Sequence, residues 1–483
     1  MLLTRLILGE NASLVEKVDI SKITISGVTA DSRSVRPGFL FAALPGTNHD
    51  GRNFVSSAIE RGAAAVMGPK GTQAPKGIPV LTCSDARATF AHLTAKFFQL
   101  QPKIIAAVTG TNGKTSVVNF TQQIWNVMGI DSVSIGTLGL RLPDGSTKPT
   151  LTTPDAVTLH RELAEAVEKN ISHVVLEASS HGLEQRRIDG VNLMAAGFTN
   201  LSHDHLDYHH TKDKYISAKM RLFKDLLTSE GVAVINADTP ESGIIRKNFC
   251  GRKITYGFKG EQLVLRRIKT ITSGIRVSAE VYGTQLTLDF PLLGKFQAYN
   301  ILCAAGLAIG CGASADRIIN TLKKLKGVEG RIQLAGNLNG GSIYIDYAHT
   351  PSALENALLS LRPHTEGRLI TVFGCGGNRD KVKRRMMGAI SEKFSDITIV
   401  TDDNPRSEDP EKIRSDILKG APNGIEIGQR ADAIEKGLKM LKAGDLLLIA
   451  GKGHEKEQII GERISPFSDL AVTKKLIETL DCI

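Results

Sequence analysis

The stretch that decides the fold is Val108-Thr-Gly110-Thr-Asn-Gly113-Lys114-Thr115-Ser116. It joins the apolar run Ile104-Ile-Ala-Ala-Val108 to a helical pattern that reaches about Met128. Backbone N–H groups and the partial positive charge of a helix N-terminus attract phosphate at such a junction. Lys114 would neutralise phosphate charge, and the Thr115 hydroxyl would reach Mg²⁺. Val108 stands where the strict P-loop has its first glycine, so the stretch predicts a tighter relative of that loop.

The patterns on either side of this loop predict three α/β domains. Before it, short apolar runs precede an amphipathic helix and indicate a small α/β domain; these segments span 39–43, 63–67, 78–81 and 85–100. After it, buried strand patterns predict a mostly parallel central sheet at 173–177, 195–198 and 232–236. Period-2 alternation over 253–293 predicts an antiparallel extension of that sheet. Further strand patterns at 342–346, 369–373, 397–400 and 446–449 indicate a Rossmann-like third domain. We expect the domains to span 1–101, 102–330 and 331–483.

The composition narrows the function classes. The length of 483 residues suits three domains that each bury a core. A formal charge of +10 suits anionic partners, but an aromatic content of 5% offers little stacking surface for single-stranded nucleic acid. The six cysteines form no C-x-x-C pair, so neither a zinc ribbon nor a disulfide scaffold is indicated. No apolar run is long enough to span a membrane, and the N-terminus lacks the form of a signal peptide, so we expect a cytoplasmic location.

Three further stretches carry candidate chemistry. Glu177 ends an apolar strand at the sheet edge where ligands collect, which makes it a candidate Mg²⁺ ligand. The run from His203 to His210 holds four histidines, but it lacks a cysteine partner or a helical H-E-x-x-H, so one histidine on the nucleotide's Mg²⁺ is favoured over zinc. Lys219 lies in a helical apolar context, where a lysine that reaches from the helix surface into solvent is the ordinary interpretation.

Taken together, these stretches resemble the Mur ligases, the ATP-dependent amide ligases of bacterial cell-wall synthesis. The resemblance covers essentially the whole chain. Its motifs are Thr109-Gly-Thr-Asn-Gly-Lys-Thr115, Glu177-Ala-Ser-Ser-His181, residues 200–210, Ala218-Lys219, Gly294-Lys-Phe-Gln-Ala-Tyr-Asn300, Gly330-Arg331 and Asp346-Tyr-Ala-His-Thr-Pro351. Within the family, Asp403-Asn-Pro-Arg406 and Gly451-Lys-Gly-His-Glu455 are similar to the members that add meso-2,6-diaminopimelate.

The resemblance implies a three-domain fold, ATP as a substrate, and two Mg²⁺ ions. It implies that Lys114, Glu177, His205 and Lys219 are catalytic, with Lys219 carbamylated, and that Thr115, Glu177, His205 and this carbamate bind metal. The implied ATP-binding residues are Gly110, Thr111, Asn112, Gly113, Lys114, Thr115, Ser116, Asn300, Arg331 and Asp346.

The resemblance also implies two further substrate sites. UDP-N-acetylmuramoyl-L-alanyl-D-glutamate would bind at Ala30, Ser32, Thr47, Asn48, His49, Leu151, Thr152, Thr153, Ser179, Gln185 and Arg187. Diaminopimelate would bind at Arg379, Asp403, Asn404, Pro405, Arg406, Gly451 and Glu455. The chain departs from the family at Gln297 and Leu151, where relatives carry Asn. Arg406 offers the planar, two-pronged donor that the extra carboxylate of diaminopimelate calls for, and lysine lacks that group.

Other functions remain open at the level of sequence. Within the same fold these are a lysine-adding ligase, a dipeptide-adding ligase and a folylpolyglutamate synthase. From another class comes a P-loop switch or a nucleic-acid-dependent ATPase, suggested by the basic charge. That class needs a basic stripe with interleaved aromatics, which the low aromatic content disfavours. We expect a monomer with no nucleic-acid or membrane partner.

Overall fold

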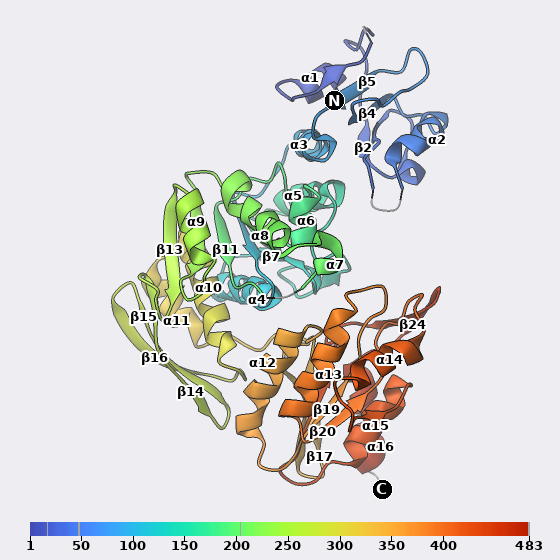
Figure 1. The fold of residues 1–483 in the computed structure, drawn as a ribbon. Coiled ribbons are helices and arrows are strands. Elements are labelled where there is room, and N and C mark those ends of the chain that lie inside the picture. Colours follow the sequence, from blue (N-terminus) through green and yellow to red (C-terminus); the bar gives the residue numbers. More distant parts are fainter. Residues whose placement is uncertain (17, 47–48, 203, 482–483) are drawn as a thin grey trace.

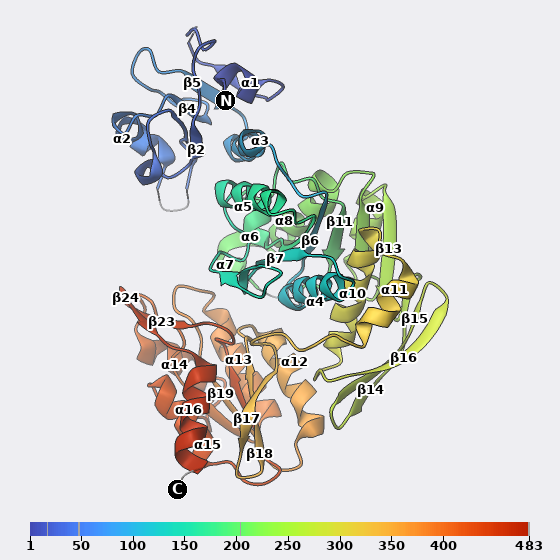
Figure 2. The ribbon, with the colours of Figure 1, turned by 180° about the vertical axis from the view of Figure 1, so that it is seen from behind.

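The computed structural model describes residues 1–16, 18–46, 49–202 and 204–481. Three blocks follow one another along the chain, with the central block between the N-terminal and C-terminal ones (Figure 1). The view from behind shows the same order (Figure 2). Each block contains one main sheet, of five, eleven and six strands. Among the described residues, no helix is long and apolar enough to cross a membrane.

The N-terminal block is a small sheet in the order β1-β5-β4-β3-β2, parallel except for its edge strand β1. Helix α3 (Ala86–Phe98) begins where the Asp85 carboxylate accepts a hydrogen bond from the Ala88 N–H at 3.0 Å. Leu40, Leu81 and Phe90 are buried between this helix and the sheet. The other elements are α1 (Leu3–Ile7), β1 (Ser13–Leu14), β2 (Gly27–Thr29), β3 (Phe39–Ala42), α2 (Val55–Glu60), β4 (Ala65–Pro69) and β5 (Val80–Cys83).

The central block is a sheet in the order β16-β15-β14-β13-β12-β11-β6-β10-β7-β8-β9. Its first half comprises β6 (Ile104–Thr109), α4 (Lys114–Val127), β7 (Ser132–Gly136), β8 (Gly139–Arg141), β9 (Thr147–Lys148), α5 (Ala156–Glu168), β10 (His173–Glu177), α6 (Ser180–Glu184), β11 (Ala195–Phe198) and α7 (Leu206–His209). Its second half comprises α8 (Lys212–Arg221), β12 (Val232–Asn236), α9 (Ser242–Asn248), β13 (Arg252–Gly257), β14 (Leu263–Ile271), β15 (Gly274–Val281), β16 (Thr284–Phe290), α10 (Phe296–Gly310) and α11 (Ala315–Leu322). The parallel centre and its antiparallel extension are as predicted, but the extension starts later than expected.

The start of the antiparallel part was misplaced because β13 reads as an alternating strand. In the structure β13 pairs parallel with both β12 and β14, and the antiparallel pairs at this edge of the sheet are β14–β15 and β15–β16. Residues 254–257 are all buried, as expected for a strand covered on both faces. The antiparallel extension therefore begins at Leu263 rather than at Lys253.

The C-terminal block is a sheet in the order β17-β18-β22-β19-β20-β21, parallel except for β17 at one edge. Its elements are β17 (Gln333–Leu338), β18 (Gly341–Asp346), α12 (Pro351–Leu361), β19 (Leu369–Phe373), α13 (Val382–Phe394), β20 (Ile397–Val400), α14 (Pro410–Leu418), β21 (Ile425–Glu426), α15 (Arg430–Lys439), β22 (Leu446–Ala450) and α16 (Asp469–Asp481). A separate hairpin follows β22, made of β23 (Glu457–Ile460) and β24 (Arg463–Pro466). The boundaries after residues 101 and 330 stay a prediction.

Candidate active site

A cleft of about 990 Å³ lies between the central and C-terminal blocks. On the central side it starts at the carboxyl ends of β6, β10 and β11, which are adjacent in the sheet. Their register places Glu177 beside Val108, and Phe198 beside Thr109. The residues that follow these strands therefore meet at one edge, where an open parallel sheet binds ligands.

The predicted phosphate loop lies between β6 and α4. Gly110 and Gly113 have φ of +147° and +87°, values that favour glycine. A Cβ at Gly113 would lie 2.4 Å from Oδ1 of Asn300, so only glycine fits there. Asn200, just after β11, fixes the loop from outside: its carbonyl accepts from the Thr111 N–H at 2.8 Å, and its Oδ1 accepts from the Asn112 N–H at 3.0 Å.

Lys114 is folded back over this loop. Its Nζ donates to the carbonyl oxygens of Gly110 at 3.0 Å and Thr111 at 2.9 Å. Burial lowers the pKa of Lys114, partly offset by the carboxylates of Glu177 and Asp204. A phosphate in the loop would supply a negative charge in direct contact with this half-buried ammonium.

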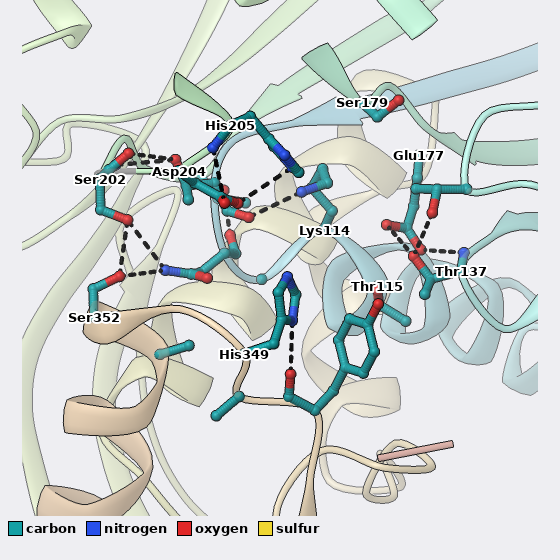
Figure 3. Close-up of a pocket in the computed structure, with 18 of the residues that line it drawn as sticks. Lys114, Thr115, Thr137, Glu177, Ser179, Ser202, Asp204, His205, His349 and Ser352 are labelled. Carbon is teal, nitrogen blue, oxygen red and sulfur yellow. Dashed lines mark hydrogen bonds and ion pairs between the residues drawn. The ribbon is translucent and has the colours of Figure 1, made fainter. Parts of the chain in front are cut away.

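Glu177 is only 1% exposed at the end of β10. Its carboxylate accepts hydrogen bonds from the Thr137 N–H at 2.8 Å and the Thr137 hydroxyl at 3.1 Å (Figure 3). A Cβ at Gly136 would lie 2.3 Å from Oε1, so glycine is needed for this close approach. The structure therefore holds a carboxylate in one orientation beside the phosphate loop.

His205 lies beside Asp204 in the same cleft (Figure 3). Its Nε2 is 3.3 Å from an Asp204 carboxylate oxygen. Burial lowers the pKa of His205 to about 3, although Asp204 opposes this shift. The ring is therefore neutral near pH 7, the state in which an imidazole nitrogen can bind a metal ion. Among the described residues, no group of three His, Cys, Asp or Glu side chains forms a metal site.

Lys219 is buried, so the expectation of a lysine at the helix surface is wrong. The side chain is 1% exposed on α8, and its Nζ donates to the Gly110 carbonyl at 2.8 Å and lies 4.4 Å from the centre of the Tyr215 ring. Burial, and then the nearby Lys114 charge, lower the pKa of Lys219 well below its usual range. The amine thus lies under the phosphate loop in a setting that favours its neutral form.

Residues from the domain junction complete the nucleotide end of the cleft. Arg331 donates to the Thr115 hydroxyl at 2.9 Å, and its guanidinium lies over the Tyr347 ring at 4.6 Å. Asp346 accepts from the Ile332 and Ala348 N–H groups, both at 2.7 Å, and burial raises its pKa. Asn300 donates to Gln297 Oε1 at 3.1 Å, so the departure at Gln297 leaves the two amides paired. All the predicted ATP-binding residues except Gly110 line the cleft, and Gly110 is part of the loop itself.

The C-terminal loops face the same cleft. Arg406 has φ of +54° and donates from Nη1 to the Gly377 carbonyl at 2.8 Å. Burial, and then the nearby Arg379 charge, lower the pKa of Arg406. Every predicted diaminopimelate residue except Pro405 lines the cleft: Arg379, Asp403, Asn404, Arg406, Gly451 and Glu455.

The predicted UDP-substrate residues fall into two separate groups. Leu151, Thr152, Thr153, Ser179, Gln185 and Arg187 line the cleft. Arg187 donates to the Thr153 carbonyl at 2.7 Å, and the Thr153 hydroxyl donates to the Glu177 carbonyl at 2.7 Å. Leu151 is 58% exposed. This group therefore connects directly to the metal-ligand candidate Glu177.

The second group lies in the N-terminal block, and the structure does not bring it to the cleft. Ala30 follows β2, Ser32 begins the next turn, and His49 packs edge-on against Phe54 at 6.3 Å. None of the three lines the cleft, because the N-terminal block stands on the far side of α5 (Figure 1). Thr47 and Asn48 lie outside the described residues, as does His203 of the histidine run.

Several cleft residues were missed by sequence reasoning. Ser352 on α12 accepts a hydrogen bond from the Asn112 amide at 3.1 Å, so the C-terminal block touches the phosphate loop directly (Figure 3). The Nδ1–H of His349 donates to the Tyr347 carbonyl at 2.8 Å, and burial lowers the pKa of His349 to about 4. Thr137 holds Glu177, as described above. The only available signal was for His349, within the Asp346-Tyr-Ala-His-Thr-Pro351 motif; Thr137 and Ser352 carry none.

Comparison with known proteins agrees with this arrangement along the chain. Three family profiles match: "Mur ligase family, catalytic domain" over residues 24–96, "Mur ligase middle domain" over 108–308 and "Mur ligase, glutamate ligase domain" over 330–453. Two relatives are each named UDP-N-acetylmuramoyl-L-alanyl-D-glutamate--2,6-diaminopimelate ligase. That of Rhizobium meliloti (strain 1021) is 47% identical, with 95% of this chain and 96% of the relative covered. That of Agrobacterium fabrum (strain C58) is 46% identical, with 96% and 95% covered.

A solved structure gives the same answer for the fold. The solved structure described as UDP-N-acetylmuramoyl-L-alanyl-D-glutamate--2,6-diaminopimelate ligase superposes with a TM-score of 0.69 at 31% identity, and the match covers 96% of this chain and 97% of that chain. This similarity extends over nearly the full length of the chain. It therefore excludes the two alternatives from another class, the P-loop switch and the nucleic-acid-dependent ATPase. The chain belongs to the Mur ligase family.

Proposed function

We propose that the chain is an ATP-dependent ligase that joins meso-2,6-diaminopimelate to the D-glutamate of UDP-N-acetylmuramoyl-L-alanyl-D-glutamate, a step in peptidoglycan precursor synthesis. One observation carries the proposal: the phosphate loop and the loops of Arg379, Arg406 and Glu455 line a single cleft. A nucleotide and a dicarboxylic amino acid can therefore meet there. The names of the relatives agree with this chemistry.

The nucleotide end would bind ATP through the loop and its surroundings. Backbone N–H groups of the loop and Lys114 would hold the phosphates. Asn300, Arg331 and Asp346 would contact the rest of the nucleotide from three different segments. Arg331, at the junction between the central and C-terminal blocks, already donates to Thr115 of the phosphate loop at 2.9 Å. A nucleotide bound at this loop would therefore contact the junction directly.

The residues beside the loop fit magnesium. Thr115 and Glu177 offer oxygen donors, which Mg²⁺ prefers, and His205 offers a neutral ring nitrogen. We propose that these three and a carbamylated Lys219 hold two Mg²⁺ ions. When bound, these ions would neutralise charge on the phosphoryl oxygens.

The surroundings of Lys219 support its carbamylation. The neutral amine attacks the carbon of CO₂ and loses one proton, which leaves a carbamate with a single negative charge. Burial and the Lys114 charge favour the neutral amine in the first place. A carbamate would also place an anion beside Lys114, whose half-buried ammonium donates to the Gly110 and Thr111 carbonyls.

The bond-forming chemistry follows from the weakness of a carboxylate as an acyl donor. Transfer of the γ-phosphoryl group of ATP to the glutamate carboxylate creates an acyl phosphate with a good leaving group, and ADP departs. The incoming amine then attacks the acyl carbon, the C–O bond to phosphate breaks, and the amide forms with loss of a proton. Lys114 would stabilise charge on the phosphoryl oxygens, and closure of the cleft around the substrates would limit hydrolysis of the acyl phosphate.

The other substrates would bind on either side of this centre. Arg406 would take the extra carboxylate of diaminopimelate and Arg379 the other carboxylate, with Asp403, Asn404 and Pro405 shaping the site. Gly451 and Glu455 would take the distal ammonium. The muramoyl-dipeptide would lie along Thr152, Thr153, Ser179, Gln185 and Arg187. Its UDP part would reach the N-terminal block at Ala30, Ser32 and residues 47–49, so domains 1–101, 102–330 and 331–483 would each contribute one binding region.

The experiment that tests the proposal measures phosphate release from ATP. Release should require both UDP-N-acetylmuramoyl-L-alanyl-D-glutamate and meso-diaminopimelate, because the first substrate forms the acyl phosphate and the amine of the second must attack it before phosphate leaves. Omission of either should reduce release to background, and DNA or RNA should not replace either one. Release driven by nucleic acid would contradict the proposal. We further propose that the protein is cytoplasmic and monomeric. Sedimentation of the purified chain would test the oligomeric state.

A further inference from the structure

Lys452 lies directly behind the amino-acid end of the cleft and does not line it. The side chain is 0% exposed. Its Nζ donates to the Glu455 carboxylate at 2.9 Å, to Asn404 Oδ1 at 3.1 Å and to the Glu457 carbonyl at 2.8 Å. All three N–H donors of this buried ammonium are therefore used within the protein. Lys452 can orient the groups that accept from it, but it has no donor left for a ligand.

Glu455 is fixed by this arrangement at one oxygen only. Its Oε2 accepts from Lys452 and from the Asn404 amide at 2.9 Å. Asn404 cannot turn away, because its Oδ1 also accepts from the Ile459 N–H at 3.0 Å. Within the described part of the chain, no hydrogen bond ends on Oε1 of Glu455, whose side chain is 29% exposed and lines the cleft. That oxygen is available to a cationic ligand.

Arg406 lines the same part of the cleft and carries the opposite charge. It is held by the Gly377 carbonyl at 2.8 Å, and a Cβ at Gly376 would lie 2.8 Å from Nη1, so its guanidinium has little room on that side. A carboxylate and a guanidinium free in one pocket form a two-pronged pair that satisfies both charges. In the described residues Glu455 and Arg406 form no such pair; Glu455 pairs with Lys452 instead.

We propose that Lys452 is a positioning residue that holds the Glu455 carboxylate apart from the Arg406 guanidinium. The amino-acid site then presents a separate anion and cation to a substrate whose far end carries both an ammonium and a carboxylate. A substrate with the ammonium alone would leave Arg406 unpaired, which costs affinity. Lys452 thereby sharpens the choice of amino acid without touching it. The inference rests on the proposed function, since it assumes diaminopimelate as the substrate.

The test compares Lys452→Met, Glu455→Gln and the double variant with the wild type, by KM for diaminopimelate and for ATP. Lys456→Met serves as the matched control, because Lys456 is an exposed lysine in the same loop. We expect Lys452→Met to raise the KM for diaminopimelate about tenfold or more, with the KM for ATP changed by less than about twofold. In the double variant, the KM should exceed that of Glu455→Gln by less than about twofold, because Lys452 acts through Glu455.

The outcomes separate a positioning role from a structural one. Equal rises in both KM values, or effects of the two substitutions that simply multiply, would overturn the inference. Should Lys452→Met fail to fold, Lys452→Gln, which keeps a donor in the same space, takes its place in the same comparison. A wild type that ligates no diaminopimelate would instead refute the proposed function, and this inference with it.

Discussion

The buried pair of Arg430 and Asp469 provides the sharpest test of what holds the amino-acid end in place. Both side chains are 0% exposed, and they form two hydrogen bonds, at 2.7 and 2.8 Å. Arg430 also donates to the Ala450 carbonyl at 2.9 Å and to the Asp402 carbonyl at 3.4 Å. These carbonyls immediately precede Gly451 and Asp403 of the cleft. The pair therefore joins the start of α15 and the start of α16 to both amino-acid loops.

The expected effect of Asp469→Asn follows from this burial. The substitution keeps the shape but leaves the guanidinium of Arg430 without its anion, and breaking a buried pair in this way costs roughly 3–5 kcal/mol. For a domain of about 150 residues each kcal/mol lowers the unfolding midpoint by about 2–4 °C, so the C-terminal transition should fall by roughly 6–20 °C. Because Arg430 also supports the two loops, the KM for diaminopimelate should rise as well.

Differential scanning calorimetry of Asp469→Asn and Asp289→Asn is the assay. Asp289 forms the same two-pronged pair with Arg276, at 2.6 and 2.7 Å, but both side chains are about half exposed. Its substitution should leave the midpoint within about 2 °C of the wild type. Equal midpoint changes in the two variants would refute the argument from burial.

Two of three further predictions concern the cleft, and the third concerns His160, a buried histidine on α5. Arg406→Lys should raise the KM for diaminopimelate roughly 10- to 100-fold, because a lysine cannot make the two-pronged contact, while the KM for ATP changes by less than about twofold; equal rises in steady-state assays would remove the specificity argument. With ¹³C-labelled bicarbonate, NMR should show a carbamate resonance in the wild type and in Lys224→Met but not in Lys219→Met, and its absence from all three would end the metal-ligand role of Lys219. Burial lowers the pKa of His160 from 6.5 to about 4, so its neutral form stabilises the fold fully above pH 6.5 and this contribution is lost as the pH falls toward 4. His160→Gln should therefore flatten the fall in unfolding free energy over that window by up to roughly 1.4 kcal/mol per pH unit, and a slope identical to the wild type in denaturant titrations would show that His160 does not contribute.

Local chemistry explains what the sequence could predict. The phosphate loop depends on one strand end, two glycines and one helix start, all within residues 104–128, and the structure has them there. Glu177 could be placed for the same reason, since a carboxylate at the end of a buried parallel strand lies at the ligand edge of the sheet. The Arg406 and Glu455 loops were found by motif, and they line the cleft.

Features that depend on distant partners could not be predicted. The burial of Lys219 follows from the Gly110 carbonyl, 109 residues earlier, and from the Tyr215 ring. Arg430 and Asp469 are 39 residues apart and carry no motif. The residues of β13 alternate between apolar and polar in sequence, yet the strand pairs parallel with β12. Its burial depends on α10, which packs against it and lies about 40 residues later in the chain. The position of the N-terminal block, which keeps Ala30 and Ser32 away from the cleft, is likewise set by packing between blocks.

The most direct test of the central claim is a comparison of two amino acids in one assay. Phosphate release from ATP would be measured with UDP-N-acetylmuramoyl-L-alanyl-D-glutamate and either meso-diaminopimelate or L-lysine, over a range of amino-acid concentrations. Because lysine leaves the Arg406 guanidinium without a carboxylate, kcat/KM for diaminopimelate should exceed that for lysine by about 100-fold or more. Equal values, or a preference for lysine, would contradict the account.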